Sequence, residues 1–208
     1  MAEEQQQLEP VVSPSTVIPV PQACPVYCTD GLDKEFRQSE IVSRVAQYDY
    51  DGGTGRVSEV YHQYVIVANQ DCDLLWDREA RDQGKPGDLN GLIVYEAEPA
   101  FDMKAKLAQG RDIWARVIQN KDERYHYLEA VPAELDLVGQ GIPPLILDLK
   151  RCFTLPVPEL HRQCRTLHGA QRRCRLETSF RDHLQSRIAF YLQRVTLVRQ
   201  HAKPVQDA

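Results

Sequence analysis

Residues 41–68 read IVSRVAQYDYDGGTGRVSEVYHQYVIVA, and this stretch decides the fold class. Residues 41–48 have the β-branched and aromatic composition of a strand, and residues 61–68 repeat that composition. Between them, residues 49–55 (DYDGGTG) are rich in the Gly and Asp residues that form turns. The stretch therefore predicts an antiparallel hairpin with a long tip, whose second strand enters the core at residues 65–67.

Further strands are expected after this hairpin. Residues 92–97 have strand composition, residues 114–119 and 124–131 predict a second hairpin around a polar turn, and residues 143–153 predict a last strand. The predicted pairing of the strands in hairpins and their irregular spacing along the chain favour an antiparallel sheet over a parallel βαβ arrangement. Two connections complete this part of the chain. They are a polar loop over residues 76–90, in which one helical turn is the alternative, and a short helix over residues 101–110.

The periodicity changes near the C-terminal end of the sequence. Apolar residues recur every four positions from Leu176 to Leu192, which is the spacing of one helical face. We therefore expect a long amphipathic helix over residues 179–199. The predicted fold class is α+β, with a small, strongly bent, mostly antiparallel sheet or β-barrel followed by this helix.

Composition divides the chain into four parts. Five of the thirteen prolines lie in the first 30 residues, which predicts an extended arm over residues 1–35. A β-domain over residues 36–158, a basic helical segment over residues 159–200 and a tail over residues 201–208 follow. No apolar run reaches the ~18–20 residues of a membrane span, and the start lacks the features of a signal peptide. We therefore expect a cytoplasmic protein with no membrane contact.

Charge is unevenly distributed along the chain. Residues 1–149 hold 13 Lys and Arg against 26 Asp and Glu, a net of −13, and residues 150–200 hold 11 against 3, a net of +8. Lys203 and Asp207 cancel, which leaves −5 for the whole chain. This asymmetry indicates either an internal contact between the two parts or a basic face for an anionic partner.

Several arginines precede the C-terminal helix and are candidates for contact with nucleic acid. Guanidinium groups near a helix start suit phosphate, because they form bidentate hydrogen bonds. The alternative is a solvated face whose arginines pair with the acidic part of the chain. The candidate nucleic-acid-binding residues are Arg162, Arg165, Arg172, Arg173 and Arg175.

The six cysteines, at positions 24, 28, 72, 152, 164 and 174, are expected to be reduced thiols. Cys24 and Cys28 have a spacing that zinc tolerates, but no second close pair supplies the two remaining ligands. We therefore expect no metal and no other cofactor.

Five residues are candidates for catalysis. Asp71 and Asp73 flank Cys72 directly after an apolar strand, where two carboxylates suit a divalent cation or proton transfer. The alternative is that they cap a turn or a helix start. At the second predicted hairpin, Lys121, Arg124 and His126 have the chemistry to contact a phosphate, with Asp122 or Glu123 as the base. The alternative is ordinary turn chemistry.

Asp148 and Lys150 have the Asp-x-Lys spacing of metal-dependent nucleases, in which the Asp holds the metal and the Lys stabilises charge at the phosphate. The usual motifs for ATP hydrolysis, dinucleotide binding, serine hydrolysis and zinc proteolysis are absent from the sequence. A nuclease is therefore the one enzyme class that we retain, although we favour a protein that is not an enzyme.

The order of four segments resembles that of the MazF/PemK-type toxins. The segments are SEIV from Ser39, YVIVANQD from Tyr64, LILDLKR from Leu145, and Arg175 with Leu176 before a helix. The resemblance spans residues 38–195 and implies an SH3-like barrel, metal-free RNA cleavage and a place in toxin–antitoxin or antiviral defence systems. The QDCDL segment at residues 70–74 departs from that pattern and is closer to uncharacterised bacterial proteins.

These observations predict a binding module of a toxin or defence system. Its basic C-terminal segment is expected to contact nucleic acid or an acidic protein partner. A protein partner is expected to be encoded by a neighbouring gene. The first alternative is an interaction subunit of a multiprotein complex that makes no nucleic-acid contact. The second is a nuclease, either a metal-free ribonuclease or a metal-dependent enzyme.

Overall fold

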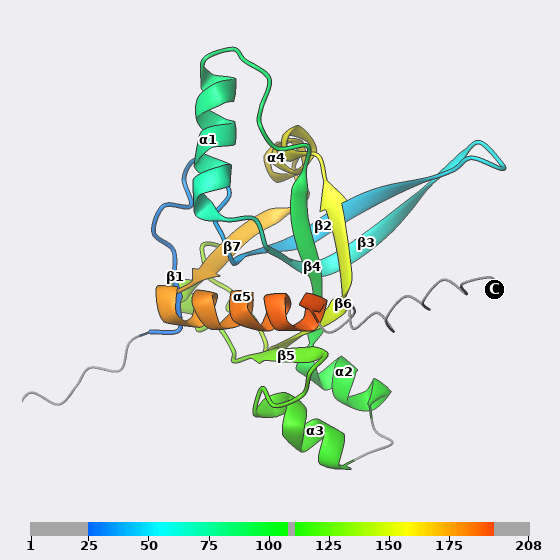
Figure 1. The fold of residues 1–208 in the computed structure, drawn as a ribbon, viewed down its shortest axis with the longest axis vertical. Helices are drawn as coiled ribbons and strands as arrows, with labels where there is room; N and C mark the ends of the chain where they lie inside the picture. The colour runs from blue at the N-terminus through cyan, green and yellow to red at the C-terminus, as the bar shows by residue number, and fades with distance from the viewer. Residues whose placement is uncertain (1–24, 108–110, 194–208) are drawn as a thin grey trace, which may run out of the picture.

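The computed structural model describes residues 25–107 and 111–193. Seven strands form one antiparallel sheet in the order β1-β7-β2-β3-β4-β6-β5, with helices packed around it (Figure 1). β1 (Tyr27–Cys28) and β5 (Tyr125–Leu128) are the two edges of this sheet. The α+β class is confirmed, but the sheet is not closed into the predicted barrel.

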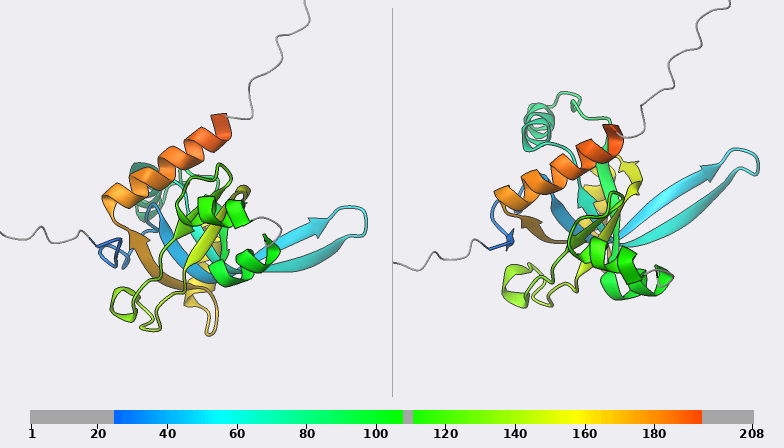
Figure 2. Two further views of the ribbon diagram at one scale, coloured as in Figure 1. Left: turned by 90° about the horizontal axis from the view of Figure 1, so that it is seen from below. Right: turned by 60° about the horizontal axis from the view of Figure 1, so that its bottom comes forward.

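The hairpin expected over residues 41–68 is present. β2 (Glu40–Asp51) and β3 (Arg56–Val67) pair along their whole lengths, from Ile41 opposite Ile66 to Asp51 opposite Arg56. Their inner halves are buried in the sheet, and their outer halves extend as a two-stranded ribbon beyond the other strands (Figures 1 and 2). The long tip expected from the turn residues is thus a regular extension of both strands.

One face of the sheet is covered by α5 (Thr178–Gln193), the described part of the expected C-terminal helix. Leu184 and Ile188 of α5 pack in one cluster with side chains of β2, β3, β4 (Leu92–Pro99) and β6 (Leu145–Leu155). The remaining residues of that expected helix, 194–199, lie outside the described residues, as does the tail over residues 201–208.

The other face is covered by α1 (Asp71–Asp82) and α4 (Val157–Arg165). Leu74 of α1 and Leu160 of α4 pack with Val42 and other valines of the central strands. Helices therefore bury apolar side chains on both faces of the sheet, as a single layer of strands requires.

The prediction of a loop over residues 76–90 is wrong for its first part, because α1 continues to Asp82. Few apolar side chains of this helix are buried, and polar contacts hold it instead. Asp77 forms an ion pair with Arg81 four residues on, and its carboxylate accepts a hydrogen bond from the backbone N–H of Leu89. That contact folds the following loop back against the helix, so tertiary polar contacts decide the structure where hydrophobic periodicity is weak.

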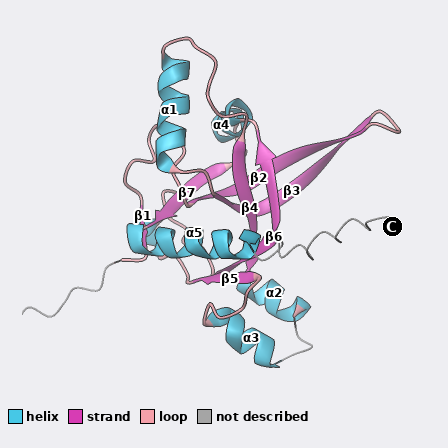
Figure 3. Ribbon diagram, in the orientation of Figure 1, coloured by secondary structure: helices cyan, strands magenta, loops and turns pink. Residues whose placement is uncertain are grey.

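The strand expected over residues 114–119 is also wrong, because α3 (Arg111–Ile118) is a helix. Trp114 and Val117 are three positions apart and pack in one cluster with Met103, which is the spacing of a helical face. The short helix expected over residues 101–110 is confirmed for its first part, as α2 (Ala100–Lys106), and residues 108–110 lie outside the described residues. Figure 3 shows α2 and α3 together beside the β5 end of the sheet.

The segment over residues 159–200 is not entirely helical as expected. β7 (Gln171–Leu176) lies between α4 and α5 and pairs with both β1 and β2. Cys174 and Leu176 alternate into the core, which is a strand pattern that the arginines between them obscure in the sequence.

Part of the predicted proline-rich arm belongs to the sheet, since β1 pairs with β7 and buries Tyr27. The hydroxyl of Tyr27 donates a hydrogen bond to the carbonyl of Glu129, shortly before the 3₁₀ helix η1 (Ala133–Leu135). Residues 1–24 of the arm lie outside the described residues. Within the described part of the chain, none of the helices is long and apolar enough to cross a membrane.

Candidate functional site

Asp71 lies at the first position of α1, where the sequence left a choice between a chemical and a capping role. Its carboxylate accepts hydrogen bonds from Arg37 Nε at 3.0 Å, from the backbone N–H of Gln38 at 2.8 Å and from Arg181 Nη1 at 3.0 Å. Burial raises the pKa of the Asp71 carboxyl, but these hydrogen bonds and the two arginine charges outweigh it and hold that pKa below its usual value. An ionised carboxylate that accepts from three residues, with Arg37 donating through both Nε and Nη2, ties α1 to α5 and to the chain before β2.

Cys72 and Asp73 do not extend this cluster into a metal site. The exposed Cys72 thiol lies 3.6 Å from Gln70 Oε1 and 3.7 Å from Asp73 Oδ1. In the described residues, no group of three or more His, Cys, Asp or Glu side chains is placed to hold a metal ion. Cys24, half of the pair weighed for zinc, lies outside the described residues.

Arg124 is engaged in a bidentate ion pair. Its Nε lies 2.7 Å from Asp148 Oδ1, and its Nη2 lies 2.5 Å from Asp148 Oδ2. The hydrogen bonds to Asp148 raise the pKa of Arg124 above its already high value. Asp148, the metal ligand of the nuclease hypothesis, therefore faces an arginine, while Lys150 of the same strand is exposed.

The structure separates the three basic candidates at residues 121–126. Lys121, Arg124 and His126 each line a different hollow of the surface. His126 is only 2 % exposed, and burial lowers its pKa to about 3, with the charges of Arg187 and His183 adding to the effect. It is therefore a neutral core residue at neutral pH.

Three of the five arginines assigned to nucleic acid already bind carboxylates of the same chain. Each of these pairs has a nitrogen–oxygen distance between 2.5 and 2.6 Å. For Arg172 and Arg173, whose pairs are largely buried, little affinity is left for a phosphate. The pair of Arg162 is exposed and therefore weak. The pairs are Arg162 with Glu159, Arg172 with Glu40 and Arg173 with Asp136.

Arg173 is the clearest departure from its expected role. It is 4 % exposed, and besides Asp136 it donates to Ser43 Oγ at 3.2 Å and to the carbonyl of Gly141 at 2.9 Å. A buried side chain cannot reach a nucleic acid, so this arginine is structural. Arg175 donates through Nε to the carbonyl of Asp30. Arg165 is exposed, and its guanidinium group makes no ion pair or hydrogen bond with the described residues.

The ribbon formed by β2 and β3 carries a group of side chains that the sequence did not single out. Residues on alternate positions of paired strands share a face, and the pairing places Tyr48, Tyr50, Val57 and Tyr61 on one face. These side chains are 50 %, 66 %, 66 % and 59 % exposed. We call this group the ribbon face. Glu59, opposite Tyr48, lies within it.

Both ends of the ribbon are fixed by specific contacts. At the tip, the carboxylate of Asp51 accepts hydrogen bonds from Gly53 N at 2.8 Å and from Thr54 Oγ1 at 2.6 Å. At the base, the two ring nitrogens of His62 lie 3.1 Å from Glu96 Oε1 and 3.1 Å from Gln47 Oε1. The ribbon is therefore a preorganised element.

A hollow of about 160 Å³ continues the ribbon face towards α4. Tyr48 and Tyr61 line it from the ribbon, and Arg162 and His168 line it from α4 and the loop that follows. Gln163 of α4 fixes the two elements together, because its side-chain amide bonds both the N–H and the carbonyl of Ala46, at 2.9 and 2.8 Å.

The ribbon face could have been found from alternation alone. Tyr48 and Tyr50 are two positions apart in the first strand. In the second strand, Val57, Glu59 and Tyr61 also follow one another at intervals of two, which is the pattern of one face of a strand. The expected strands ended at Tyr48 and began again at Tyr61, so that Tyr50 and Val57 fell in the expected tip and the alternation was missed. Comparison of the chain with protein-family models, with curated proteins and with solved structures finds no match.

Proposed function

We propose that this chain is an interaction subunit that binds a partner protein through the ribbon face. The observation that carries the proposal is the exposure of Tyr48, Tyr50, Val57 and Tyr61 on one side of an arm that extends beyond the sheet (Figure 2). Tyrosine is enriched in protein interfaces, where it supplies large contact area at low entropic cost. A cluster of exposed apolar side chains on one element indicates an interaction site.

The ribbon is expected to contribute little to the stability of the fold. Its residues 48–60 belong to none of the apolar clusters of the described residues. A two-stranded ribbon that buries no core of its own is marginal in water. Its regular pairing and its anchored tip and base therefore point to a role outside the core.

Charge favours a protein over a nucleic acid as the partner. Residues 47–60 carry Asp49, Asp51 and Glu59 against Arg56, a net of −2. A phosphate backbone would be repelled by this element. The partner that fits is a protein with an apolar groove flanked by lysines or arginines.

The other functions expected from the sequence receive less support. A nuclease needs its acid, base and phosphate ligands in one place, and Lys121, Arg124 and His126 line three different hollows. The proposal does not rest on the resemblance to MazF/PemK-type toxins or on an SH3-like barrel. A place in a defence system remains a proposal that depends on the identity of the partner.

Site-specific cross-linking in the native host tests the proposal. A photoreactive phenylalanine analogue is placed at Tyr50, on the ribbon face, and separately at Phe101, which is 83 % exposed on α2. We expect one protein to be cross-linked from position 50 and not from position 101. The identified partner is then purified, and its binding to this chain is measured directly.

Variants of the ribbon face decide whether the binding is specific. The double variant Tyr48→Ser/Tyr50→Ser is expected to weaken binding of the purified partner at least tenfold, whereas Phe101→Ser leaves it unchanged. Higher salt is expected to weaken the complex because of the acidic residues beside the face. Equal binding by both variants would overturn the proposal, as would a cross-link to nucleic acid in place of a protein.

A further inference from the structure

The outer half of β3 carries backbone groups that are free to pair with another strand. The side-chain amide of Gln163 bonds both the N–H and the carbonyl of Ala46, so these two groups point away from β3. Ala46 is opposite Tyr61, which makes these residues a non-hydrogen-bonded pair of the antiparallel ladder. The N–H and the carbonyl of Tyr61 therefore point away from β2 as well.

Two further residues of β3 are in the same kind of pair. Hydrogen-bonded and non-hydrogen-bonded pairs alternate along an antiparallel ladder, and the register with β2 is regular from Tyr61 to Glu59 and Val57. β4 pairs with β3 only at residues 64–67, so no described strand pairs with these three residues on the side away from β2. We call their outward N–H and carbonyl groups the β3 edge. Figure 2 shows this part of the ribbon extending beyond the other strands.

Three other strand edges of the described chain are blocked or short. On β2, Gln163 occupies both backbone groups of Ala46. On β5, the side-chain amide of Asn120 bonds the N–H and the carbonyl of Tyr127, at 2.6 and 3.0 Å. β1 at the opposite border of the sheet has only two residues. Proteins protect strand edges in these ways because an open edge pairs with other chains, and no side chain of the described residues bonds the β3 edge.

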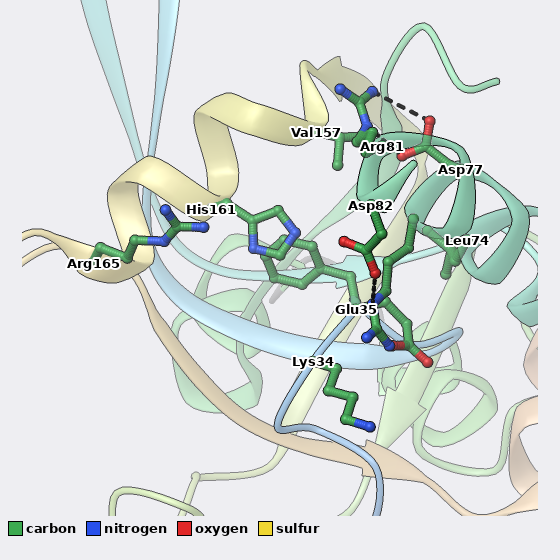
Figure 4. Close-up of a pocket in the computed structure, with 11 residues that line it drawn as sticks. Lys34, Glu35, Leu74, Asp77, Arg81, Asp82, Val157, His161 and Arg165 are labelled. Atoms are coloured by element: carbon green, nitrogen blue, oxygen red, sulfur yellow. Dashed lines mark hydrogen bonds and ion pairs between the residues drawn. The ribbon is translucent and has the colours of Figure 1, made fainter. Parts of the chain in front are cut away.

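The polar groups around the cavity between α1 and α4 are, by contrast, bound within the chain. This cavity measures about 350 Å³, and Figure 4 shows the guanidinium group of Arg81 directed at the carboxylate of Asp77. Arg78 likewise binds both Glu35 and Asp82. The carboxylates of the cavity thus have partners already, and the β3 edge is the stronger candidate for a binding site.

The side chains along the β3 edge define what a paired strand must carry. Val57, Glu59 and Tyr61 are on the ribbon face, and Val57 and Tyr61 are 66 % and 59 % exposed. Side chains that are directly opposite each other on paired strands interact, and opposite charges there are stabilising. A strand that fits therefore has a lysine or arginine opposite Glu59 and an apolar residue two positions to either side of it.

Glu59 argues against a second copy of this chain as the occupant. In an antiparallel pairing of two copies centred on residue 59, Val57 of each copy would be opposite Tyr61 of the other. These apolar pairs would favour association, but the two Glu59 carboxylates would be directly opposite each other, which is destabilising. A charge on an exposed edge protects a protein against pairing with itself in this way.

We propose that the partner adds a strand antiparallel to the β3 edge, with a lysine or arginine opposite Glu59 and apolar side chains beside Val57 and Tyr61. This proposal rests on the proposed function, because it names the element of the partner that meets the ribbon. In strand addition, backbone hydrogen bonds supply the affinity and alternate side chains supply the specificity. The apolar side chains of the added strand extend the ribbon face.

A variant of this chain tests the proposal without the unidentified partner. Glu59→Lys keeps Val57 and Tyr61 and so supplies an edge strand with the chemistry expected of the partner. We expect the unchanged chain and the Glu59→Lys chain to associate with each other about tenfold more tightly than either associates with itself, because opposite charges replace like charges at the central pair. Sedimentation velocity over a range of concentrations measures this association. The amide protons of Glu59 and Tyr61 in the isotopically labelled unchanged chain are expected to exchange more slowly in the mixture.

Two substitutions of Val57 separate backbone pairing from side-chain contact. Val57→Pro removes an N–H that β2 does not use, whereas Val57→Ala removes the same side chain and keeps that N–H. Introduced into the otherwise unchanged chain, Val57→Pro is expected to weaken association with the Glu59→Lys chain about tenfold relative to Val57→Ala. Circular dichroism checks that both variants are folded.

Three outcomes would overturn the proposal. These are a mixture that associates no more tightly than the separate chains, equal association by the Val57→Pro and Val57→Ala chains, and dimerisation of the unchanged chain by itself, which assigns the β3 edge to a second copy. Because the experiment uses only this chain, its failure leaves the proposed function supported by the side chains of the ribbon face. The absence of a cross-linked protein at position 50 overturns the proposed function whatever the mixture shows.

Discussion

Arg173 and Asp136 form the most deeply buried ion pair among the described residues. Two hydrogen bonds of 2.7 and 2.6 Å join them, and Asp136 also accepts from the backbone N–H groups of Val138 and Gln140. Burial raises the pKa of the Asp136 carboxyl, but these bonds and the arginine charge outweigh it and lower that pKa overall. The pair connects β7 to the loop that follows η1.

Removal of Arg173 alone is expected to be costly. Arg173→Met leaves the Asp136 carboxylate buried without its cation, and we expect the free energy of unfolding to fall by about 3–5 kcal/mol. Denaturation in urea measures this loss. Arg175→Met is the matched control, because Arg175 is on the same strand and makes one hydrogen bond to a carbonyl at an exposed position. The double variant Arg173→Met/Asp136→Leu is expected to recover part of the loss, and a double variant that loses as much as the sum of both single variants would contradict this account.

The lowered pKa of His126 makes the free energy of unfolding depend on pH. Its pKa is about 3 in the folded protein, well below the ordinary value near 6.5 expected in the unfolded chain. Between those two values the unfolded chain binds one more proton, so stability is highest above about pH 6.5 and falls as the pH is lowered. The His126→Leu variant is expected to reduce the slope of unfolding free energy by about 1.4 kcal/mol per pH unit between pH 4.5 and 6. Identical slopes in the variant and the unchanged protein would show that His126 does not carry the effect.

The partners in the buried ion pairs could not be predicted from the sequence, because they are far apart in the chain. Arg172 and Glu40 are 132 positions apart in the chain, and Arg173 and Asp136 are 37 apart. The net charge of residues 150–200 predicted contacts with carboxylates or with an anionic partner. No local sequence pattern predicts which carboxylate pairs with which arginine. The position of Asp71 at a helix start could be predicted because it depends on neighbouring residues. The capping role could not be confirmed, because the Asp71 carboxylate binds Arg37, Gln38 and Arg181 and not the N–H groups of α1.

The ribbon can be shortened without removing any side chain of the described apolar clusters. Gln47 and Val60 are directly opposite each other, so a two-residue Asn-Gly turn in place of residues 48–59 closes the hairpin at that pair. We expect this shortened chain to keep its melting temperature within a few degrees, because no residue of the described apolar clusters is removed. Circular dichroism during heating measures this. A collapse of the melting temperature would show that the ribbon supports the fold.

Two elements could be predicted from periodicity, and two could not. The hairpin over residues 41–68 and the helix over residues 179–193 have strong and unambiguous patterns. α3 was mistaken for a strand because Val117 and Ile118 have high strand propensity, yet packing of Trp114 and Val117 on Met103 selects the helix. β7 was mistaken for helix because its buried face is only Cys174 and Leu176, with arginines between them.

At the scale of the whole molecule, the charge asymmetry is largely an internal contact. Arginines of the basic part bind carboxylates of the acidic part at four places. At one of them Arg151 of β6 binds Glu96 and Glu98 of β4. The other three join β7 and α5 to the chain before β2, to the loop after η1 and to the start of α1. The pairs are Arg172 with Glu40, Arg173 with Asp136 and Arg181 with Asp71. The alternative in which these arginines pair with the acidic part of the chain therefore describes them better than a basic face for an anionic partner does.

This arrangement predicts that the protein does not bind nucleic acid. A nucleic-acid surface needs several unpaired cations in a row, whereas the chain has a net charge of −5 and Arg165 is the one member of the predicted basic cluster whose guanidinium group has no partner among the described residues. We expect no shift of a 30-nucleotide single strand or a duplex in an electrophoretic assay at 50 mM salt and 10 µM protein. A cationic peptide of similar concentration is the positive control. Binding whose logarithm falls linearly with the logarithm of the salt concentration would contradict this prediction, because such a slope counts phosphates neutralised by free lysines and arginines.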